Sequence, residues 1–442
     1  MLLTELSELM RNSGVAGAGG AGFPSYAKLN AAADTLILNC AECEPLLKLH
    51  RQVLERYARE IVGTLSLIAD TLDAGRVIIA VKPAYKEAVK AVEKVLPEFP
   101  KASIGFLPEV YPAGDEVVTI YETTGRVVRP GALPITVGCI VYNVETVYNI
   151  WCAMNESKPV TSKYITIAGE VKNPSTYKAP LGMTYGELIE LAGGATVKDY
   201  ALVGGGPMTG RIVSESDVVT KTSNAVLVLP KNHFVIQKKT AKIKIDMHRA
   251  MAACCQCRMC TDLCSRNLLG HPIEPHLFMR SATSGVTKDL KPFVNTMYCS
   301  ACGLCEMYAC GQGLSPRTLI GEVKAGLRAN GFKPDPNVKM DDVNPNRSGR
   351  MVPVERLTAR LGLTPYDKPA PIIDTEVKPA VVRIMLSQSI GVPATASVKP
   401  GDAVKVGDVI GTAAEGKLSM PVHASIDGTV TEVTPKYVVI HA

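Results

Sequence analysis

The chain has 442 residues, of which 46% are hydrophobic and 20% charged, and this length predicts roughly three domains or several smaller ones. Its longest run without Asp, Glu, Lys or Arg covers only residues 12–27 and is mostly Gly and Ala, which argues against a membrane span. The net charge of +6 is small for this length and only 5% of the residues are aromatic, so nucleic acid is not an expected partner.

Residues 1–157 alternate apolar, strand-like runs with amphipathic helical stretches. The first ten residues contain no basic region followed by an apolar stretch, so no secretory signal and a cytoplasmic location are expected. Strands are predicted at 35–39, 76–81 and 137–142, and helices at 48–71, 84–96 and 144–154. This alternation predicts an α/β domain.

The pattern changes after residue 157. Residues 158–235 contain short strands at 164–167, 201–203 and 225–229 and one helix at 185–192, which predicts a small α+β module. Two runs of cysteines occupy 245–330, and residues 331–378, which begin with a stretch rich in Pro, Asn and Asp, are expected to be a linker. Residues 379–442 alternate turn signals with short Val- and Ile-rich strands, as in a small all-β barrel.

The cysteine spacing predicts metal binding. In a reducing cytosol the thirteen cysteines are not expected to persist as disulfides. Eight of them form a C-x2-C-x2-C-x3-C run and a C-x2-C-x2-C-x4-C run, and spacing of this kind is typical of a ferredoxin-like module with two 4Fe–4S clusters. In such modules the fourth cysteine of each run ligates the other cluster. One predicted ligand set is therefore Cys254, Cys257, Cys260 and Cys310, and the other is Cys299, Cys302, Cys305 and Cys264.

Structural zinc is the alternative for these runs, although zinc usually takes two separated C-x2-C pairs. Among the other cysteines, Cys139, Cys152 and Cys255 are expected to be neutral thiols. Cys40 and Cys43 form a C-x2-C, for which a redox dithiol is the less favoured interpretation.

Three polar or glycine-rich motifs accompany the predicted strands of the first domain. The run from Gly17 to Gly22 contains four glycines, which let backbone N–H groups approach a phosphate or a flat ring, and Lys28 follows within reach of an anion. The motif NCAECEP directly follows the first strand, and NVET follows the third. Ligands in open α/β sheets bind beyond the carboxyl ends of such strands.

Together, GAGGAGFPSYAKL, NCAECEP, YPAGDE and NVET resemble the flavin domain shared by the NADH-oxidising subunit of respiratory complex I and the RnfC protein of the Rnf complex. The resemblance implies a Rossmann-like flavin domain that holds FMN, with NADH stacked above it. The residues that it assigns to the cofactor site are Gly17, Gly19, Gly20, Gly22, Lys28, Asn39, Glu42, Glu44, Gly114, Glu116 and Asn143.

Some of these assignments have a structural alternative, and the glycine loop could be a flexible turn. Glu42 and Glu44 could belong to a solvated loop, and Asn143 could simply cap the helix that follows it. Ala18 and Ala41 stand where the complex I proteins have Arg and Asp, so the Rnf-like branch is the closer match.

The later modules extend the resemblance. Residues 158–235 resemble a soluble ligand-binding β-grasp module, with the glycine-rich run 204–210 expected to be a turn. Residues 379–442 resemble a biotinyl/lipoyl-type barrel-sandwich, in which a carrier role for Lys417 is improbable. With the barrel-sandwich placed last, this order of modules is similar to that of the cobalamin reductases of propanediol-utilisation microcompartments.

The predicted fold class is therefore a multidomain α/β and α+β protein with a two-cluster ferredoxin module and an all-β barrel-sandwich. The resemblance implies an NADH-dependent reductase that passes electrons through FMN and two 4Fe–4S clusters to cobalamin, as substrate, inside a bacterial microcompartment. The partners that it implies are a cob(I)alamin adenosyltransferase and shell proteins, whereas no corrinoid-binding residue can be named from the sequence. The alternatives are a peripheral electron-transfer subunit of an Rnf-type ferredoxin:NAD oxidoreductase and a non-catalytic scaffold that has lost its flavin.

Overall fold

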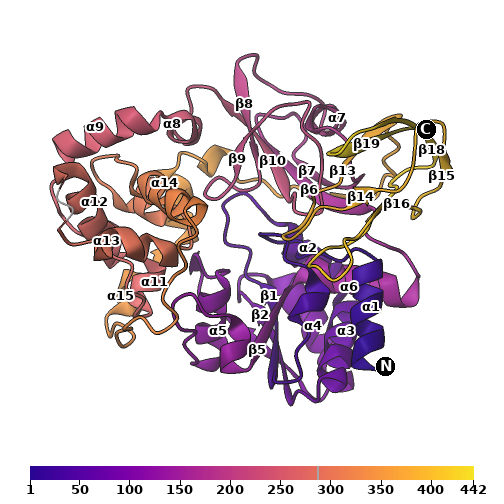
Figure 1. The fold of residues 1–442 in the computed structure, drawn as a ribbon, viewed down its shortest axis with the longest axis horizontal. Helices are drawn as coiled ribbons and strands as arrows, with labels where there is room; N and C mark the ends of the chain where they lie inside the picture. Colours follow the sequence, from indigo (N-terminus) through magenta and orange to yellow (C-terminus); the bar gives the residue numbers. More distant parts are fainter. Residues whose placement is uncertain (286–287) are drawn as a thin grey trace.

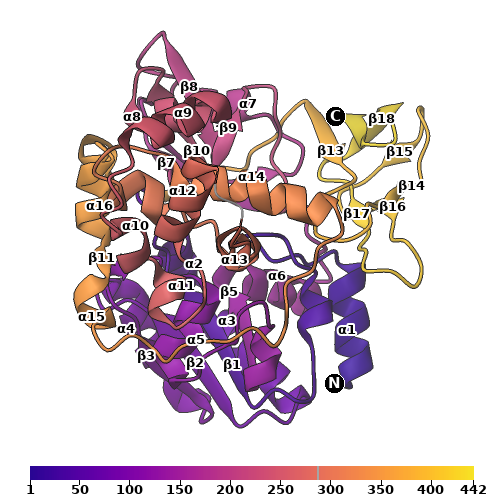
Figure 2. The same cartoon turned by 60° about the vertical axis from the view of Figure 1, so that its left-hand side comes forward.

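The structure is a computed structural model that describes residues 1–285 and 288–442. Figure 1 shows four bodies: a flavin-type α/β domain, a β-grasp module, a cysteine-bearing helical module and a C-terminal all-β module. The C-terminal module packs beside the first helix, so segments from the two ends of the sequence lie side by side (Figure 2). No helix among the described residues is long and apolar enough to cross a membrane.

The first domain is built on a four-stranded parallel sheet in the order β3-β2-β1-β5. Alternate residues of β1 point to opposite faces, so that Leu36 and Leu38 pack under α2, α3, α4 and α6 whereas Ile37 packs under α5. The elements are α1 (Leu3–Asn12), β1 (Thr35–Cys40), α2 (Leu49–Arg56), α3 (Ala58–Thr71), β2 (Arg76–Val81), α4 (Lys86–Val95), β3 (Ala102–Phe106), β4 (Val110–Tyr111), α5 (Glu116–Thr124), β5 (Cys139–Asn143) and α6 (Val144–Asn155).

The predicted helix at 48–71 is in fact two helices. The backbone of Tyr57 leaves the helical region at φ −126° and ψ 36°, and its ring stacks on Tyr148 with centroids 4.1 Å apart. The apolar periodicity continues through the break, and for this reason the sequence does not reveal it.

The β-grasp module has a six-stranded mixed sheet in the order β12-β7-β6-β10-β8-β9. β10 lies parallel to β6 and antiparallel to β8, and α7 is closed at its start by a capping box between Thr184 and Glu187. The elements are β6 (Ser162–Gly169), β7 (Ser175–Pro180), α7 (Tyr185–Leu191), β8 (Tyr200–Gly204), β9 (Arg211–Val213), β10 (Ala225–Pro230) and α8 (Phe234–Thr240).

The cysteine-bearing module consists of helices joined by loops around a small apolar core that includes Phe278, Leu319 and Ile320. Its elements are α9 (Ile243–Ala253), α10 (Met259–Asp262), α11 (Ser265–Leu268), α12 (Pro275–Ser284), α13 (Lys291–Val294) and α14 (Pro316–Ala329).

Residues 331–378, expected to be a linker, form several short elements that tie the modules together. These are α15 (Arg347–Arg350), β11 (Val352–Pro353), α16 (Val354–Arg360) and β12 (Ile372–Ile373). β11 pairs with β4 of the flavin domain, and β12 adds an edge strand to the β-grasp sheet. This Pro- and Asn-rich segment, here called the strap, therefore connects two modules by pairing with strands that are distant in sequence.

The C-terminal module is a sandwich of two antiparallel sheets and not a closed barrel. One sheet has the order β13-β19-β18-β15 and the other β14-β16-β17, around a core that includes Ile384, Ile410 and Ile440. The strands are β13 (Val381–Met385), β14 (Thr395–Ala396), β15 (Ala403–Val404), β16 (Val409–Thr412), β17 (Val422–His423), β18 (Gly428–Val433) and β19 (Tyr437–His441).

Candidate functional site

A pocket of about 800 Å³, open to solvent, lies between the glycine loop and the carboxyl ends of β1 and β5. Nine of the eleven residues expected to hold FMN line it: Gly17, Gly19, Gly20, Gly22, Lys28, Asn39, Gly114, Glu116 and Asn143. The remaining wall comes from Ala21, Phe23, Ser25, Val141, Tyr142 and Thr146. The fold thus brings residues of all four sequence motifs together around one pocket.

The glycine loop is held against the start of α6. The amide of Ala18 donates to Thr146 Oγ1 at 2.9 Å, and Gly17 N donates to Phe23 O at 2.9 Å to close the loop. A Cβ at Gly19 would lie 2.4 Å from Asn143 Nδ2, so only glycine allows this approach.

Lys28 supplies a positive charge at the rim of the pocket. Its Nζ donates to Glu116 Oε1 at 3.0 Å and to the carbonyl of Val141 at 2.8 Å. The side chain remains 26% exposed, so its ammonium group is held in place but is still accessible to an anionic ligand.

The two asparagines at the ends of the strands are fixed by backbone contacts. Asn39 Nδ2 donates to Gly114 O at 3.0 Å, and its Oδ1 accepts from Ala41 N at 3.0 Å. Asn143 Oδ1 accepts from Glu145 N at 3.0 Å and so caps α6, while its Nδ2 lies 3.2 Å from His50 Nε2. Asn143 is therefore both a helix cap and part of the pocket wall.

Glu42, in contrast, does not line the pocket. It is buried and its carboxylate accepts from the backbone amides of Leu49 at 2.8 Å and His50 at 3.2 Å, which satisfies the first turn of α2. The structure therefore differs from the sequence expectation for this residue, because a free helix terminus lies nearer than the ligand site.

Glu44 also points away from the pocket, toward the β-grasp module. It accepts from Met208 N at 2.8 Å and from Thr209 N at 2.9 Å. A Cβ on Gly206 would lie 2.3 Å from Glu44 Oε2, so the run 204–210 is a close-fitting turn around this carboxylate. Its role is to join two modules.

Sequence reasoning did not single out Ser25, although it lies within the first motif. Ser25 is 1% exposed and lines the pocket, and its Oγ has no hydrogen-bond partner among the residues that the structure describes. A buried hydroxyl without a partner is costly unless a ligand satisfies it. Together with the glycine cradle and Lys28, this hydroxyl fits an anionic flavin such as FMN.

The eight predicted cluster ligands form two separate groups, here called the exposed group, which contains the exposed Cys257, and the buried group, whose members are all partly buried. The exposed group consists of Cys254, Cys257, Cys260 and Cys310, which border a cavity of about 370 Å³ that includes open solvent. The pKa of the Cys260 thiol is raised to about 12, mainly by burial and further by the nearby charges of Cys310, Cys257 and Cys254.

The buried group consists of Cys264, Cys299, Cys302 and Cys305. Burial is the main reason that the pKa of the Cys302 thiol is raised to about 12, and the nearby charge of Cys264 adds to it. Cys305 likewise has Cys299, Cys302 and Cys264 as charged neighbours. The fourth cysteine of each run thus lies with the other run, as the crossed ligand sets require.

A cubane takes one thiolate per iron, so these sets fit 4Fe–4S clusters without converging on one point. Within residues 1–285 and 288–442, no three His, Cys, Asp or Glu side chains converge on a single-ion position.

Cys40 and Cys43 are not arranged for thiol chemistry. Burial raises the pKa of the Cys40 thiol far above its usual value and that of Cys43 to about 12. Both are therefore protonated at neutral pH, and a thiol is a poor nucleophile.

A second pocket of about 850 Å³ adjoins the first and shares Phe23, Lys28 and Glu116 with it. Its other walls are mainly apolar and include Ile390 of the C-terminal module. Ile390 N donates to Gly22 O at 3.0 Å, so the last module of the chain touches the glycine loop of the first.

Four families match successive parts of the chain. Residues 10–152 match the Nuo51 FMN-binding domain, 164–212 the SLBB domain, 253–315 the 4Fe–4S dicluster domain and 364–442 the RnfC barrel sandwich hybrid domain. The chain therefore combines an FMN-binding domain with a dicluster iron–sulfur domain.

Three known proteins show how far the similarity extends. The chain is 39% identical over 437 residues to the cobalamin reductase PduS of Salmonella typhimurium, covering 99% of this chain and 96% of that protein. It is 31% identical over 270 residues to a component of the ion-translocating oxidoreductase complex of Edwardsiella ictaluri, covering 60% of this chain and 32% of that protein. A crystal structure of an NAD+-reducing NiFe hydrogenase in the H2-reduced state matches 75% of this chain and 63% of its own, with 20% identity and a TM-score of 0.49.

The similarity to PduS covers all four bodies, in the same chain order and over nearly the full length of both proteins. The FMN-binding and dicluster domains account for the pocket and the two cysteine groups described above. The chain belongs to the PduS family of cobalamin reductases, and it is a flavin and iron–sulfur oxidoreductase.

Proposed function

We propose that this chain is an NADH-dependent cobalamin reductase. Electrons would pass from NADH through FMN and two 4Fe–4S clusters to cob(III)alamin and cob(II)alamin, and so support the regeneration of adenosylcobalamin for a diol dehydratase. The observation that carries the proposal is that one chain of the PduS family holds a flavin-type pocket and two groups of four cysteines. Bound FMN supplies the conversion of a two-electron hydride into single electrons.

The residues of the chain bind and orient in this proposal, and none is required as an acid or nucleophile. The glycine loop leaves room for the flavin, and Lys28 offers its ammonium group to an anion while Glu116 restrains it. Ser25 Oγ and the exposed edge of Asn143 supply polar contacts in the pocket wall. The adjoining apolar pocket shares Phe23 and Lys28 and offers room for the dinucleotide.

The wider setting belongs to the same proposal. A location within a bacterial microcompartment, with an adenosyltransferase and shell proteins as neighbours, follows from the family of the relative. A peripheral subunit of an Rnf-type ferredoxin:NAD oxidoreductase is the second candidate, favoured by the match of residues 364–442 to the RnfC barrel sandwich hybrid domain.

The test begins with anaerobic purification and loading with FMN, iron and sulfide. Excess NADH should convert hydroxocobalamin to cob(II)alamin, followed by absorbance, and the conversion should require FMN. Lys28→Ala should lose at least tenfold in rate, whereas Lys101→Ala, at an exposed ion pair with Asp70, should not. If NADH reduces flavin and clusters while cobalamin stays oxidised, the acceptor is wrong. Activity confined to a membrane fraction would favour the second candidate.

A further inference from the structure

The geometry points to a fixed order for the two cysteine groups: electrons enter the iron–sulfur module at the buried group and leave it at the exposed group. This inference rests on the proposed electron transfer from flavin to clusters, and it adds which four cysteines hold each position. The argument depends on one loop of the flavin domain, on the surroundings of each group, and on their exposure to solvent.

Residues 111–116 connect the flavin pocket with the buried group. Gly114 and Glu116 line the pocket, and between them Asp115 accepts hydrogen bonds from Arg266. Tyr111 Oη, at the start of the loop, donates to the carbonyl of Cys302 at 2.6 Å. A segment of six residues therefore touches both the flavin site and a ligand of the buried group.

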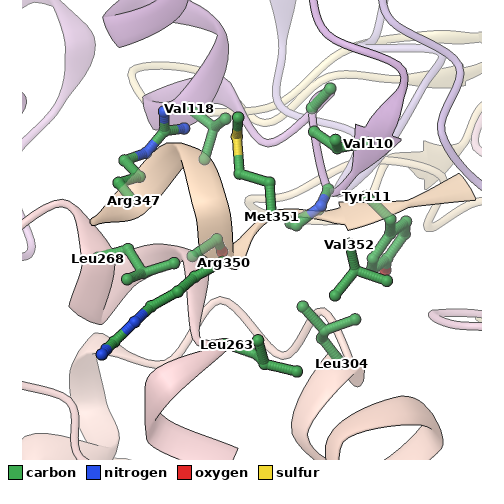
Figure 3. A pocket seen from close by; sticks show the side chains of 13 residues that line it. Val110, Tyr111, Val118, Leu263, Leu268, Leu304, Arg347, Arg350, Met351 and Val352 are labelled. Carbon is green, nitrogen blue, oxygen red and sulfur yellow. The ribbon is translucent and has the colours of Figure 1, made fainter. Parts of the chain in front are cut away.

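The same loop packs against residues adjacent to the ligands. Figure 3 shows a small pocket with Val110 and Tyr111 on one side and Leu263 and Leu304 on the other. Leu263 precedes Cys264, and Leu304 precedes Cys305.

The buried group is enclosed by three modules. Tyr111 of the flavin domain, Met208 of the β-grasp module and Leu304 and Met307 of the cysteine module belong to one apolar core, against which Cys302 packs. This group is therefore in contact with the domain that binds the flavin, although each of its four cysteines is partly exposed.

The exposed group has different surroundings. All residues that line its cavity lie between 254 and 316, and none belongs to the flavin domain. Cys257 is exposed, and the neighbouring Met251 and Met259 are 58% and 42% exposed. An external acceptor can approach this group at Cys257, whereas every cysteine of the buried group is partly buried and the group is in contact with Tyr111 of the flavin domain.

The electron count is consistent with two clusters in sequence that each carry one electron at a time. Each NADH that becomes NAD+ and a proton releases two electrons, which leave singly and reduce two molecules of a one-electron acceptor such as cob(III)alamin. The chain itself forms or breaks no covalent bond in this transfer. The protein contributes the position of each cluster relative to the flavin.

The order can be tested with cysteine variants that each remove one cluster. Cys257→Ala should lose the exposed cluster and Cys302→Ala the buried one, while Cys255→Ala, at an exposed neighbour, should keep both by iron analysis. After mixing with NADH and rapid freezing, low-temperature EPR should show the remaining cluster of Cys257→Ala reduced as fast as in the wild type. In Cys302→Ala the remaining cluster should be reduced at least tenfold more slowly, although dithionite still reduces it.

The reverse pattern, or equally fast reduction in both variants, would overturn the order. If Cys302→Ala does not fold, brief treatment of the wild type with ferricyanide and EDTA should remove the more accessible cluster first. The surviving cluster should then be reduced by NADH at the wild-type rate, and a cluster that stays oxidised contradicts the order.

Failure of the proposed function gives a different result. If NADH does not reduce the wild-type clusters, NADH is not the donor, and light-driven reduction of bound FMN replaces it in the same comparison of variants. Cobalamin is absent from all of these measurements, so a wrong acceptor does not affect them.

Discussion

Arg266 donates two hydrogen bonds to Asp115 Oδ2, from Nε at 3.0 Å and from Nη2 at 2.9 Å. Both side chains are largely buried, with 18% and 8% exposed. Arg266 lies two residues after Cys264, and Asp115 lies between two residues of the flavin pocket. This ion pair therefore fastens the iron–sulfur module to the edge of the flavin site.

Removing the negative charge should loosen this attachment. Asp115→Asn keeps an oxygen to cap α5 but leaves the largely buried Arg266 without its counter-ion, which should cost about 1.5–3 kcal/mol. Hydrogen exchange of residues 263–270 should become faster, while FMN affinity changes less than about twofold. Asp70→Asn, at an exposed pair with Lys101, is the control. Unchanged protection in the Asp115 variant would show that the pair does not hold the modules together.

A methyl group in the glycine loop should weaken flavin binding. In Gly19→Ala the new Cβ would meet Asn143 Nδ2 at 2.4 Å, so Asn143 must move in the pocket wall. We expect the FMN dissociation constant to rise about tenfold or more, equivalent to ~1.4 kcal/mol, in a fluorescence-quenching titration. Gly75→Ala, where nothing lies within 4 Å, should bind FMN normally. Wild-type affinity in Gly19→Ala would mean that the loop yields to the side chain.

Glu44 should matter for stability and not for the cofactor. Glu44→Ala leaves the amides of Met208 and Thr209 without their charged acceptor, at a cost of about 1.5–3 kcal/mol. The melting temperature should fall while the FMN dissociation constant stays within about twofold of the wild type. Glu55→Ala, at an exposed position on α2, should change neither quantity. A large loss of FMN affinity would restore the flavin-binding role that the sequence motif predicts.

Lys221 should make stability depend on pH. Burial lowers the pKa of its ammonium group to about 7, and its Nζ donates to Gly14 O at 2.8 Å and Pro421 O at 3.3 Å. Between pH 7 and about 10.4 the unfolded chain binds this proton and the folded chain does not, so stability should rise with pH by up to ~1.4 kcal/mol per unit.

The comparison of melting temperatures from pH 7 to 10 isolates this contribution. Lys221→Met should lose the rise that the wild type shows, because no charge then has to be buried. Lys231→Met, at an exposed ion pair with Asp199, should keep the wild-type slope. Identical slopes in all three proteins would mean that Lys221 does not titrate in this range.

The sequence alone was informative where local spacing determines the chemistry. The intervals between the cysteines predict two close triplets, and the two-cluster pattern adds a fourth cysteine to each triplet from the other run; the structure gathers the same two sets. Asn39 and Asn143 lie at the carboxyl ends of two parallel strands, which share an edge of the sheet, and the glycine loop and Lys28 lie against the same pocket.

The sequence misled where a backbone amide outside the motif decides the direction of a side chain. Glu42 and Glu44 belong to the motif that follows β1, yet one satisfies the amides of α2 and the other binds a turn about 160 residues away. The strap formed by β11 and β12 has the composition of a linker, and only its pairing with β4 and β7 gives it structure. No local pattern encodes the contact of Glu44 or the pairing of the strap.

The contact between Gly22 and Ile390 has a consequence for biosynthesis. The glycine loop is among the first segments to leave the ribosome, but its neighbour in the C-terminal module is among the last, as is Ser419, whose carbonyl accepts from Tyr26 Oη. A nascent chain that already contains every residue of the flavin pocket still lacks this support. Cofactor loading is thus expected to follow release from the ribosome, and premature termination anywhere before the final sandwich would yield a protein with an unsupported loop at the entrance to its site.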